Sequence, residues 1–325
     1  MMLTHVQLRV QPGDSEAESK IITTLHSLVD GSLEPQAAAQ TIDAEIVRDC
    51  QEAYASYTSV SNPSQEQLAD GTIRAPRPVG WMKFLWDCMG RAAMDVPATH
   101  SGQDHLISLL QELQQLPKHQ VPWLASGNLI EKELWTLNAK NDYEGLSQWL
   151  WELHEGILTG GREAEEDPAV ALEYVNFSAF LARLFGNGVA ETTRLSALIK
   201  PSPFATPFAS FAVQYVDDAE AISRYEPYAS AAAQWIIFAG DALFEMCSEG
   251  VLVEIGKQRW TRKLWDSWKV NFDSVAKDES FSEQARGYAT QALERMDQVE
   301  KHDFGETESV VQKFGLITPD TLDED

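Results

Sequence analysis

Apolar residues recur every three or four positions along most of the chain, which is the spacing of amphipathic helices. The segment from Ala229 to Met246 is apolar on nearly every side of such a helix. Its few polar interruptions are Ser230, Gln234, Asp241 and Glu245. A helix of this kind is normally buried in a larger protein. We therefore predict that it lies at the centre of the fold, with other helices packed around it.

Similar stripes predict the other helices of the chain. These helices are expected over residues 15–29, 32–57, 80–94, 101–116, 141–158, 168–185, 256–276 and 282–301, with a short helix over 129–137. Strand signals are almost absent, apart from a short extended pair between Gly250 and Gly256. The pattern predicts an all-α fold, a compact array of about nine or ten helices without an extended sheet.

Breaks in the pattern suggest the domain organisation. Residues 1–14 are expected to be an N-terminal extension, and residues 15–302 a single helical domain. If that domain has two lobes, the glycine-rich and charged stretch at 159–167 is where they join. The Pro- and Phe-rich segment at 200–211 is expected to be irregular. Residues 303–325 form an acidic C-terminal tail.

Composition and charge limit the classes of partner. The chain is 44% apolar with ten tryptophans, enough for a sizeable core. Its 50 acidic and 25 basic side chains give a net charge of −25, which repels nucleic acid and anionic membranes. No signal peptide or membrane-spanning segment is visible, and three widely spaced cysteines are expected to be reduced and mostly buried. We expect a soluble cytoplasmic protein.

Four segments carry a family resemblance. They are NFSAFLARL at 176–184, AAAQWIIFAG at 231–240, RWTRKLWDSWKVNF at 259–272 and ATQALERM at 289–296, supported by GSLEPQAAAQTID at 31–43. Together they resemble a family of filamentous ascomycete proteins with a conserved domain of unknown function. The resemblance implies an all-helical fold and a fungal source, and it brings no activity or catalytic residues.

Motifs of known chemistry are missing from the sequence. The seven histidines show no metal-ligand spacing, so we expect no metal site. The aspartate-rich stretch beginning at Asp217 lacks the acid spacing of the terpene synthases. There is no nucleophile elbow, phosphate-binding loop or dinucleotide fingerprint, and we expect no cofactor.

The stretch around Trp265 reverses the charge of the chain. Its cations are Lys257, Arg259, Arg262, Lys263 and Lys269, against the single acid Asp266. It is either a site for an anionic ligand or acidic partner, or a basic surface paired with the protein's own carboxylates, which we favour. Trp265 lies beside the stripe of Trp260 and Trp268, so its sequence position is compatible with packing or with ligand contact.

A second basic, tryptophan-bearing stretch lies at Arg74, Arg77 and Trp81. Guanidinium groups bind carboxylate or phosphate bidentately and stack on indoles. We therefore predict one basic island for an anion, in which these three residues join Arg259, Arg262 and Trp265.

The polar residues of the central helix, including Gln234 and Asp241, form a line along one side. This line is either a narrow solvent-facing edge, which we favour, or the lining of a pocket in which Asp241 has a shifted pKa.

The leading functional hypothesis is a non-catalytic binding or interaction protein with an unknown protein partner or a small anionic or amphipathic ligand. The alternative is a cofactor-free enzyme of fungal secondary metabolism that acts on a small amphipathic or anionic substrate. An enzyme would bring Asp241 and Glu245 together in a closed pocket with another acid or a histidine.

Overall fold

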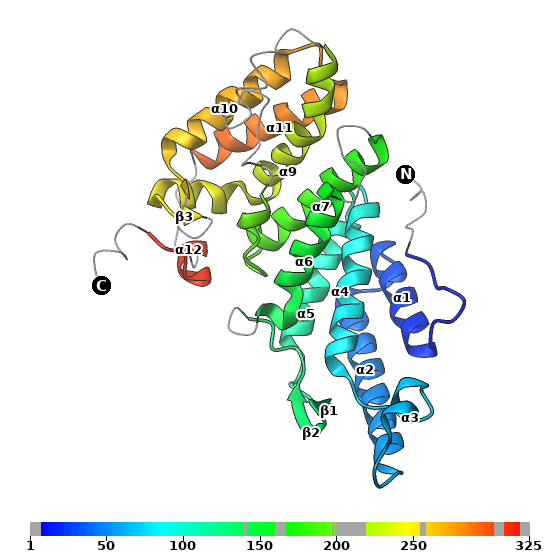
Figure 1. The fold of residues 1–325 in the computed structure, drawn as a ribbon. Coiled ribbons are helices and arrows are strands. Elements are labelled where there is room, and N and C mark those ends of the chain that lie inside the picture. The colour runs from blue at the N-terminus through cyan, green and yellow to red at the C-terminus, as the bar shows by residue number, and fades with distance from the viewer. Residues whose placement is uncertain are drawn as a thin grey trace. The chain divides into compact units, whose positions relative to one another are not determined.

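The computed structural model describes residues 8–138, 142–159, 167–196, 198, 219–253, 258–301 and 309–318. In these ranges it contains eleven α-helices and two small two-stranded sheets (Figure 1). The predicted all-α fold is confirmed. The chain divides into two compact units, residues 1–150 and 151–325, and the division falls inside α6 (Asp142–Thr159). We describe each unit by itself.

Unit 1 is built around helix α2. Its elements are α1 (Glu16–Val29), α2 (Pro35–Thr58), α3 (Gln65–Ala69), α4 (Pro78–Asp95), α5 (Gly102–Gln115), β1 (Gln120–Ala125) and β2 (Asn128–Glu133). Helix α2 contacts α1, α4, α5 and β1. Its residues Ala38, Ile42, Ile46 and Cys50 follow one another at four-residue spacing and are fully buried. This stripe supplies the apolar surface against which the unit folds.

Unit 2 is built around helix α9. Its elements are α7 (Pro168–Gly186), the 3-10 helix η2 (Thr193–Leu195), α9 (Ala219–Glu249), β3 (Leu252–Val253), β4 (Gln258–Arg259), α10 (Arg262–Lys277), α11 (Glu283–Val299) and α12 (Val310–Phe314). Helix α9 contains the predicted central helix and contacts α7, α10, α11 and α12. Trp235, Ile236 and Leu243 are fully buried. The prediction of a buried helix with other helices around it is confirmed for this unit.

Helices α7 and α9 run side by side in the same direction. In the first half of each helix, the rings of Tyr174 and Tyr228 lie 5.6 Å apart. Near the end of α7, a Cβ atom added to Gly186 would lie 2.4 Å from the carbonyl oxygen of Phe238. The two backbones therefore approach closely, and only glycine fits at position 186 without a shift of the helices.

Helix α11 runs in this direction too. The backbone N–H of Ser282, at its start, donates to Glu226 of α9 at 2.7 Å. Towards its end, Arg295 packs on Gly240. Three of the helices of unit 2 therefore point the same way.

The predicted short helix over 129–137 is wrong, because strands β1 and β2 form an antiparallel hairpin at residues 120–133. Its two-residue turn consists of Ser126 and Gly127, with φ values of 49° and 82°. Positive φ at both positions is typical of a type I′ turn, whose twist matches that of the paired strands. Of the extended pair expected between Gly250 and Gly256, β3 lies in that range, but its partner β4 lies at 258–259, in a stretch predicted to be helical; Leu252 lies opposite Arg259.

Several predicted features of the chain's organisation lie partly or wholly outside the described residues. These are most of the proposed join at 159–167 and the whole Pro- and Phe-rich segment at 200–211. Within the predicted acidic tail, helix α12 is described, and its Phe314 stacks on Phe185 of α7 with ring centroids 5.6 Å apart. A search of the described helices for one long and apolar enough to cross a membrane finds none.

Candidate functional site

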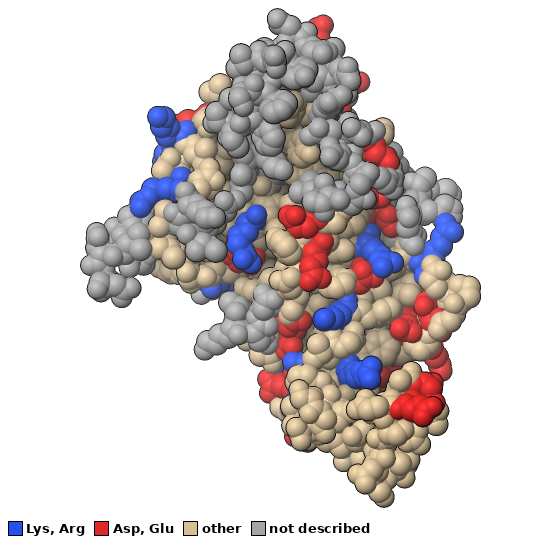
Figure 2. Space-filling view, viewed as in Figure 1, with Lys and Arg blue, Asp and Glu red and all other residues tan. Residues whose placement is uncertain are grey.

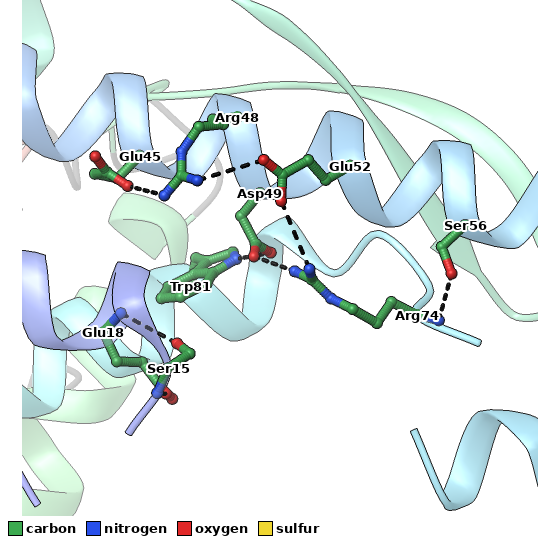
Figure 3. Close-up of polar contacts among 9 residues, drawn as sticks. All are labelled: Ser15, Glu18, Glu45, Arg48, Asp49, Glu52, Ser56, Arg74 and Trp81. Carbon is green, nitrogen blue, oxygen red and sulfur yellow. Dashed lines mark hydrogen bonds and ion pairs between the residues drawn. The ribbon is translucent and has the colours of Figure 1, made fainter. Parts of the chain in front are cut away.

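Arg74 and Trp81, the first half of the predicted island, bind one carboxylate of α2 (Figure 3). The Arg74 guanidinium pairs with Asp49 and lies 3.7 Å from Glu52. The indole N–H of Trp81 donates to the other oxygen of Asp49 at 2.9 Å. The backbone N–H of Arg74 donates to Ser56 at 3.0 Å. These contacts attach the segment before α4, and α4 itself, to α2.

Further charges extend this network along α2. Arg48 pairs with Glu45 and with Glu52, so that acids and arginines alternate on the helix surface (Figure 3). Arg77 is exposed and forms no ion pair with a described residue. In this half of the predicted island, the charge of Arg74 is balanced by the protein's own acids.

Trp265, in the second half of the predicted island, is part of the core of unit 2. It is fully buried, and its ring lies 5.1 Å from Phe244 and 6.2 Å from Trp268, measured between centroids. Its indole N–H donates to Glu300 of α11 at 2.9 Å. Trp265 therefore packs in the core of unit 2, and a ligand contact of this residue stays a prediction.

Glu300 also forms an ion pair with a lysine. The Lys269 ammonium lies 2.8 Å from Glu300 and 2.6 Å from Asp297. Burial of Glu300 favours its neutral form, but the hydrogen bonds from Lys269 and Trp265 prevail and lower its pKa below the ordinary value. Glu300 is thus an ionised anchor between α10 and α11.

Three cations at the start of α10 have a different environment. Arg259, Arg262 and Lys263 are exposed, and none forms an ion pair with any residue in the described ranges. The Arg262 guanidinium instead lies over the ring of Phe244, 3.9 Å from its centroid. We call these three residues the α10 basic face. Figure 2 shows Lys and Arg atoms gathered at the edge of the molecule where α10 begins.

The position of these cations on α10 is electrostatically unfavourable. Arg262 and Lys263 occupy the first turn, which contains no acidic residue. The N-terminus of a helix carries the positive end of its dipole, so a cation there typically costs about 0.3–1 kcal/mol. The helix dipole therefore does not favour cations at these positions.

The two halves of the predicted island belong to different units. Arg74, Arg77 and Trp81 lie in unit 1, whereas Arg259, Arg262 and Trp265 lie in unit 2. That they form one site stays a prediction.

The polar line of α9 divides into two parts. Gln234 is fully buried, and its amide N–H donates to the carbonyl of Ser230 at 3.4 Å. Asp241, whose side chain is 49% exposed, pairs with Arg295 of α11. Glu245 accepts a hydrogen bond from Ser309, the N-cap residue of α12. Asp241 and Glu245 therefore hold neighbouring helices in place.

One polar cluster was missed by the sequence analysis. Asp43 of α2 is only 6% exposed, and its carboxylate accepts the indole N–H of Trp135 at 2.8 Å. Nδ1 of His119 lies 3.0 Å from the same carboxylate, and the imidazole is 45% exposed. A carboxylate that holds Nδ1 leaves Nε2 available for proton transfer. His119 and Trp135 are 76 and 92 positions from Asp43 in the chain, so no local motif reveals the cluster.

The three cysteines are buried and free, as predicted. Burial raises the pKa of each thiol to about 12, so Cys50, Cys88 and Cys247 are protonated at neutral pH. Across the described ranges, no group of three or more His, Cys, Asp or Glu side chains is arranged to hold a metal ion.

Comparison with protein families gives one match. Residues 86–272, more than half of the chain, match a family described as a protein of unknown function (DUF3632). This range contains three of the four segments that suggested the resemblance, and it confirms the expected domain of unknown function without indicating a source organism. No curated protein and no solved structure matches the chain.

Proposed function

The chain belongs to the DUF3632 family, whose function is unknown, and we propose from its own residues that it is a non-catalytic binding protein. Its ligand is an anionic partner, either an acidic protein segment or a small anion, bound through the α10 basic face. The observation that supports this most strongly is the grouping of Arg259, Arg262 and Lys263, none of which forms an ion pair with a described residue.

The acidic composition of the chain makes this grouping significant. With 50 acidic residues against 25 basic ones, this chain has twice as many acids as cations that could pair with them. Lys269, one to two turns further along α10, pairs with two carboxylates, those of Asp297 and Glu300. Three cations, in the first turn and in the strand before it, form no ion pair with a described residue, as expected of a surface that binds anions from outside the chain.

The stacking of Arg262 on Phe244 adds geometric selectivity. A guanidinium held flat on an aromatic ring keeps its N–H groups at the edge of the plane. That edge suits the two oxygens of a carboxylate or phosphate. We therefore expect Arg262 to be the main contact, with Arg259 and Lys263 adding attraction at longer range.

The roles of Asp241 and Glu245 also favour binding over catalysis. Each binds a group on another helix, Arg295 and Ser309 respectively. Among the residues that the structure describes, neither acid converges with another acid or a histidine, as the enzyme hypothesis required.

The test is a charge-neutralising triple variant, Arg259→Gln, Arg262→Gln and Lys263→Gln. The probe is a fluorescein-labelled peptide of eight glutamates, and its affinity is measured by fluorescence anisotropy. We expect at least a tenfold loss of affinity relative to the unmodified protein, and weaker binding by both proteins at high salt.

The matched control removes three cations that are already paired: Arg48→Gln, Arg91→Gln and Lys277→Gln. It changes the net charge by the same amount and should alter affinity by less than about threefold, because screened long-range charges contribute little. If the two triple variants lost affinity equally, the loss would come from the change in net charge alone. That result would contradict the proposed site.

The enzymatic alternative is favoured by one observation, the Asp43–His119 pair. A histidine fixed by a buried carboxylate and open to solvent has the geometry of a general base. A screen of p-nitrophenyl esters tests this alternative directly. Hydrolysis that is lost in His119→Gln would support an enzyme, whereas no hydrolysis, or hydrolysis that persists in this variant, would leave the pair as an anchor of β1 on α2.

A further inference from the structure

The two edges of the β1–β2 hairpin differ in their backbone hydrogen bonds. Because Ser126 and Gly127 form a two-residue turn, Ala125 and Asn128 close it as a hydrogen-bonded pair, and the pairs alternate from there. Leu124 thus directs its backbone outward on the β1 side, and its N–H donates to the carbonyl of Pro76 at 3.0 Å. The β1 edge is therefore bonded at Leu124 to the segment before α4.

The same alternation assigns the outward backbone groups of β2. They belong to Leu129, Glu131 and Glu133, the partners of non-hydrogen-bonded pairs. No backbone hydrogen bond within the described part of the chain reaches them. Three N–H groups and three carbonyls are thus presented at the spacing of a ladder that an extended chain could join.

The side chains along this edge determine which chain would fit. Leu129, Glu131 and Glu133 point to one face, since they are two residues apart. Leu129 is 39% exposed and Ile130 is 45% exposed. An added antiparallel strand would therefore need an apolar residue opposite Leu129 and cations opposite the two glutamates.

Edge strands are commonly protected from pairing by proline or by an outward lysine. Here the proline of the hairpin, Pro122, lies on the β1 side. The lysine of β2, Lys132, is only 18% exposed and lies 2.6 Å from Glu144. The outward charges are thus both negative, which repels acidic strands and leaves the edge accessible to a basic one.

Pairing with a second copy of this edge is disfavoured by the same charges. An antiparallel pair centred on Glu131 places this residue opposite itself, and one centred on Lys132 places Glu131 opposite Glu133. Like charges directly opposite each other destabilise a sheet. These two registers are therefore unfavourable for a second copy, and a basic segment of a different chain matches the charges of the edge better.

We propose that the β2 edge is a docking site for an extended segment of a partner protein with the pattern Lys/Arg-x-Lys/Arg-x-apolar, which adds as a third, antiparallel strand. This surface lies in unit 1 and carries acids, so it is independent of the α10 basic face. The two would bind partners of opposite charge.

The test uses the labelled heptapeptide Thr-Lys-Thr-Lys-Thr-Val-Thr as the probe, with Thr-Glu-Thr-Glu-Thr-Val-Thr as its charge-reversed control. The informative variant is Glu131→Pro. It removes the outward N–H while the hydrogen bonds between β1 and β2 remain, as Pro122 shows at the opposite position of the natural hairpin. Glu131→Gln removes the charge and keeps the N–H.

We expect the unmodified protein to bind the lysine peptide and not the glutamate peptide. Affinity should fall at least tenfold in Glu131→Pro and about threefold in Glu131→Gln. In the complex, the amide protons of Leu129, Glu131 and Glu133 should become protected from hydrogen exchange. The amide protons of Trp123 and Ile130, which face each other in the hairpin, should stay protected in the proline variant and thereby report that the hairpin is intact.

Three results would overturn the proposal. The first is an unmodified protein that binds neither peptide. The second is a proline variant with an intact hairpin that binds the lysine peptide as the unmodified protein does. The third is binding without new protection on β2, which would place the peptide elsewhere on the acidic surface.

Discussion

The two tryptophan-bearing basic stretches use the same arrangement of groups with different outcomes. In unit 1, Trp81 and Arg74 share the carboxylate of Asp49. In unit 2, Trp265 and Lys269 share the carboxylate of Glu300. Each set joins helices through an indole N–H, a carboxylate and a cation. The difference is that unit 2 has further cations beside its set.

This difference separates a structural contact from a candidate binding surface. Arginine beside tryptophan is equally visible in both stretches of the sequence. In unit 1, Arg74 is the cation that pairs with the shared carboxylate. In unit 2, Lys269 has this role, and Arg262 stacks on Phe244 instead. An excess of cations over acidic partners is therefore the informative feature, more than the residue types themselves.

The largest expected difference between the two sets comes from removing the indoles. Trp265→Ala should lower the free energy of unfolding by about 3–5 kcal/mol, because the ring is fully buried among aromatic neighbours. Trp81→Ala should cost less, about 1–3 kcal/mol, because this ring is only partly buried. Denaturant unfolding measures both, and equal costs would contradict the distinction between a core ring and a peripheral one.

Removing the shared carboxylate should affect both units similarly. Asp49→Ala and Glu300→Ala each leave a cation and an indole N–H without their acceptor, and we expect each to cost about 1–2 kcal/mol after allowance for solvent screening. Chemical denaturation of the two variants in parallel gives the comparison. A cost at only one site would show that the two sets are not equivalent.

The Glu300 set should also make stability depend on pH. Its pKa is lower in the folded protein than in the unfolded chain, so its contribution is present at neutral pH and is lost as the pH falls below about 4.3 and through the lowered value. Unfolding free energies of the unmodified protein and Glu300→Gln, measured between pH 7 and pH 3, should therefore converge on acidification. A constant difference between them would be inconsistent with a lowered pKa.

The smallest expected effects on stability concern the arginines. Arg74→Gln should cost up to about 1 kcal/mol, because it removes a half-exposed ion pair. Arg262→Gln should change stability by less than about 0.5 kcal/mol, since the lost stacking on Phe244 is offset by relief at the helix N-terminus. Thermal unfolding of both variants tests this, and a large loss in Arg262→Gln would assign that residue a structural role.

The helical parts of the fold were predictable because their signal is local. The apolar stripe of α2 and the nearly all-apolar α9 are visible as periodic patterns in a single stretch of sequence. The hairpin was missed because Leu129, Ile130, Leu134 and Leu137 imitate helical spacing. Its turn is Ser-Gly, which signals a type I′ turn less strongly than Asn-Gly does.

The candidate sites were only partly predictable, because pairing is decided by residues distant in sequence. The basic stretch at 259–263 could be recognised by its charge. That Arg74 meets Asp49, and that Arg262 meets an aromatic ring, follows only from how helices pack. The Asp43–His119 pair is the extreme case, since it joins α2 to the residue just before the hairpin.

The common direction of α7 and α9 determines how far this chain could be shortened. A helix of 19 residues is about 28 Å long, and the chain leaving Gly186 must cover that length again before α9 begins beside the start of α7. A fully extended chain needs at least about eight residues for this distance. Deletions between α7 and α9 are therefore compatible with the topology only down to that length, and a shorter linker would force the two helices to run in opposite directions.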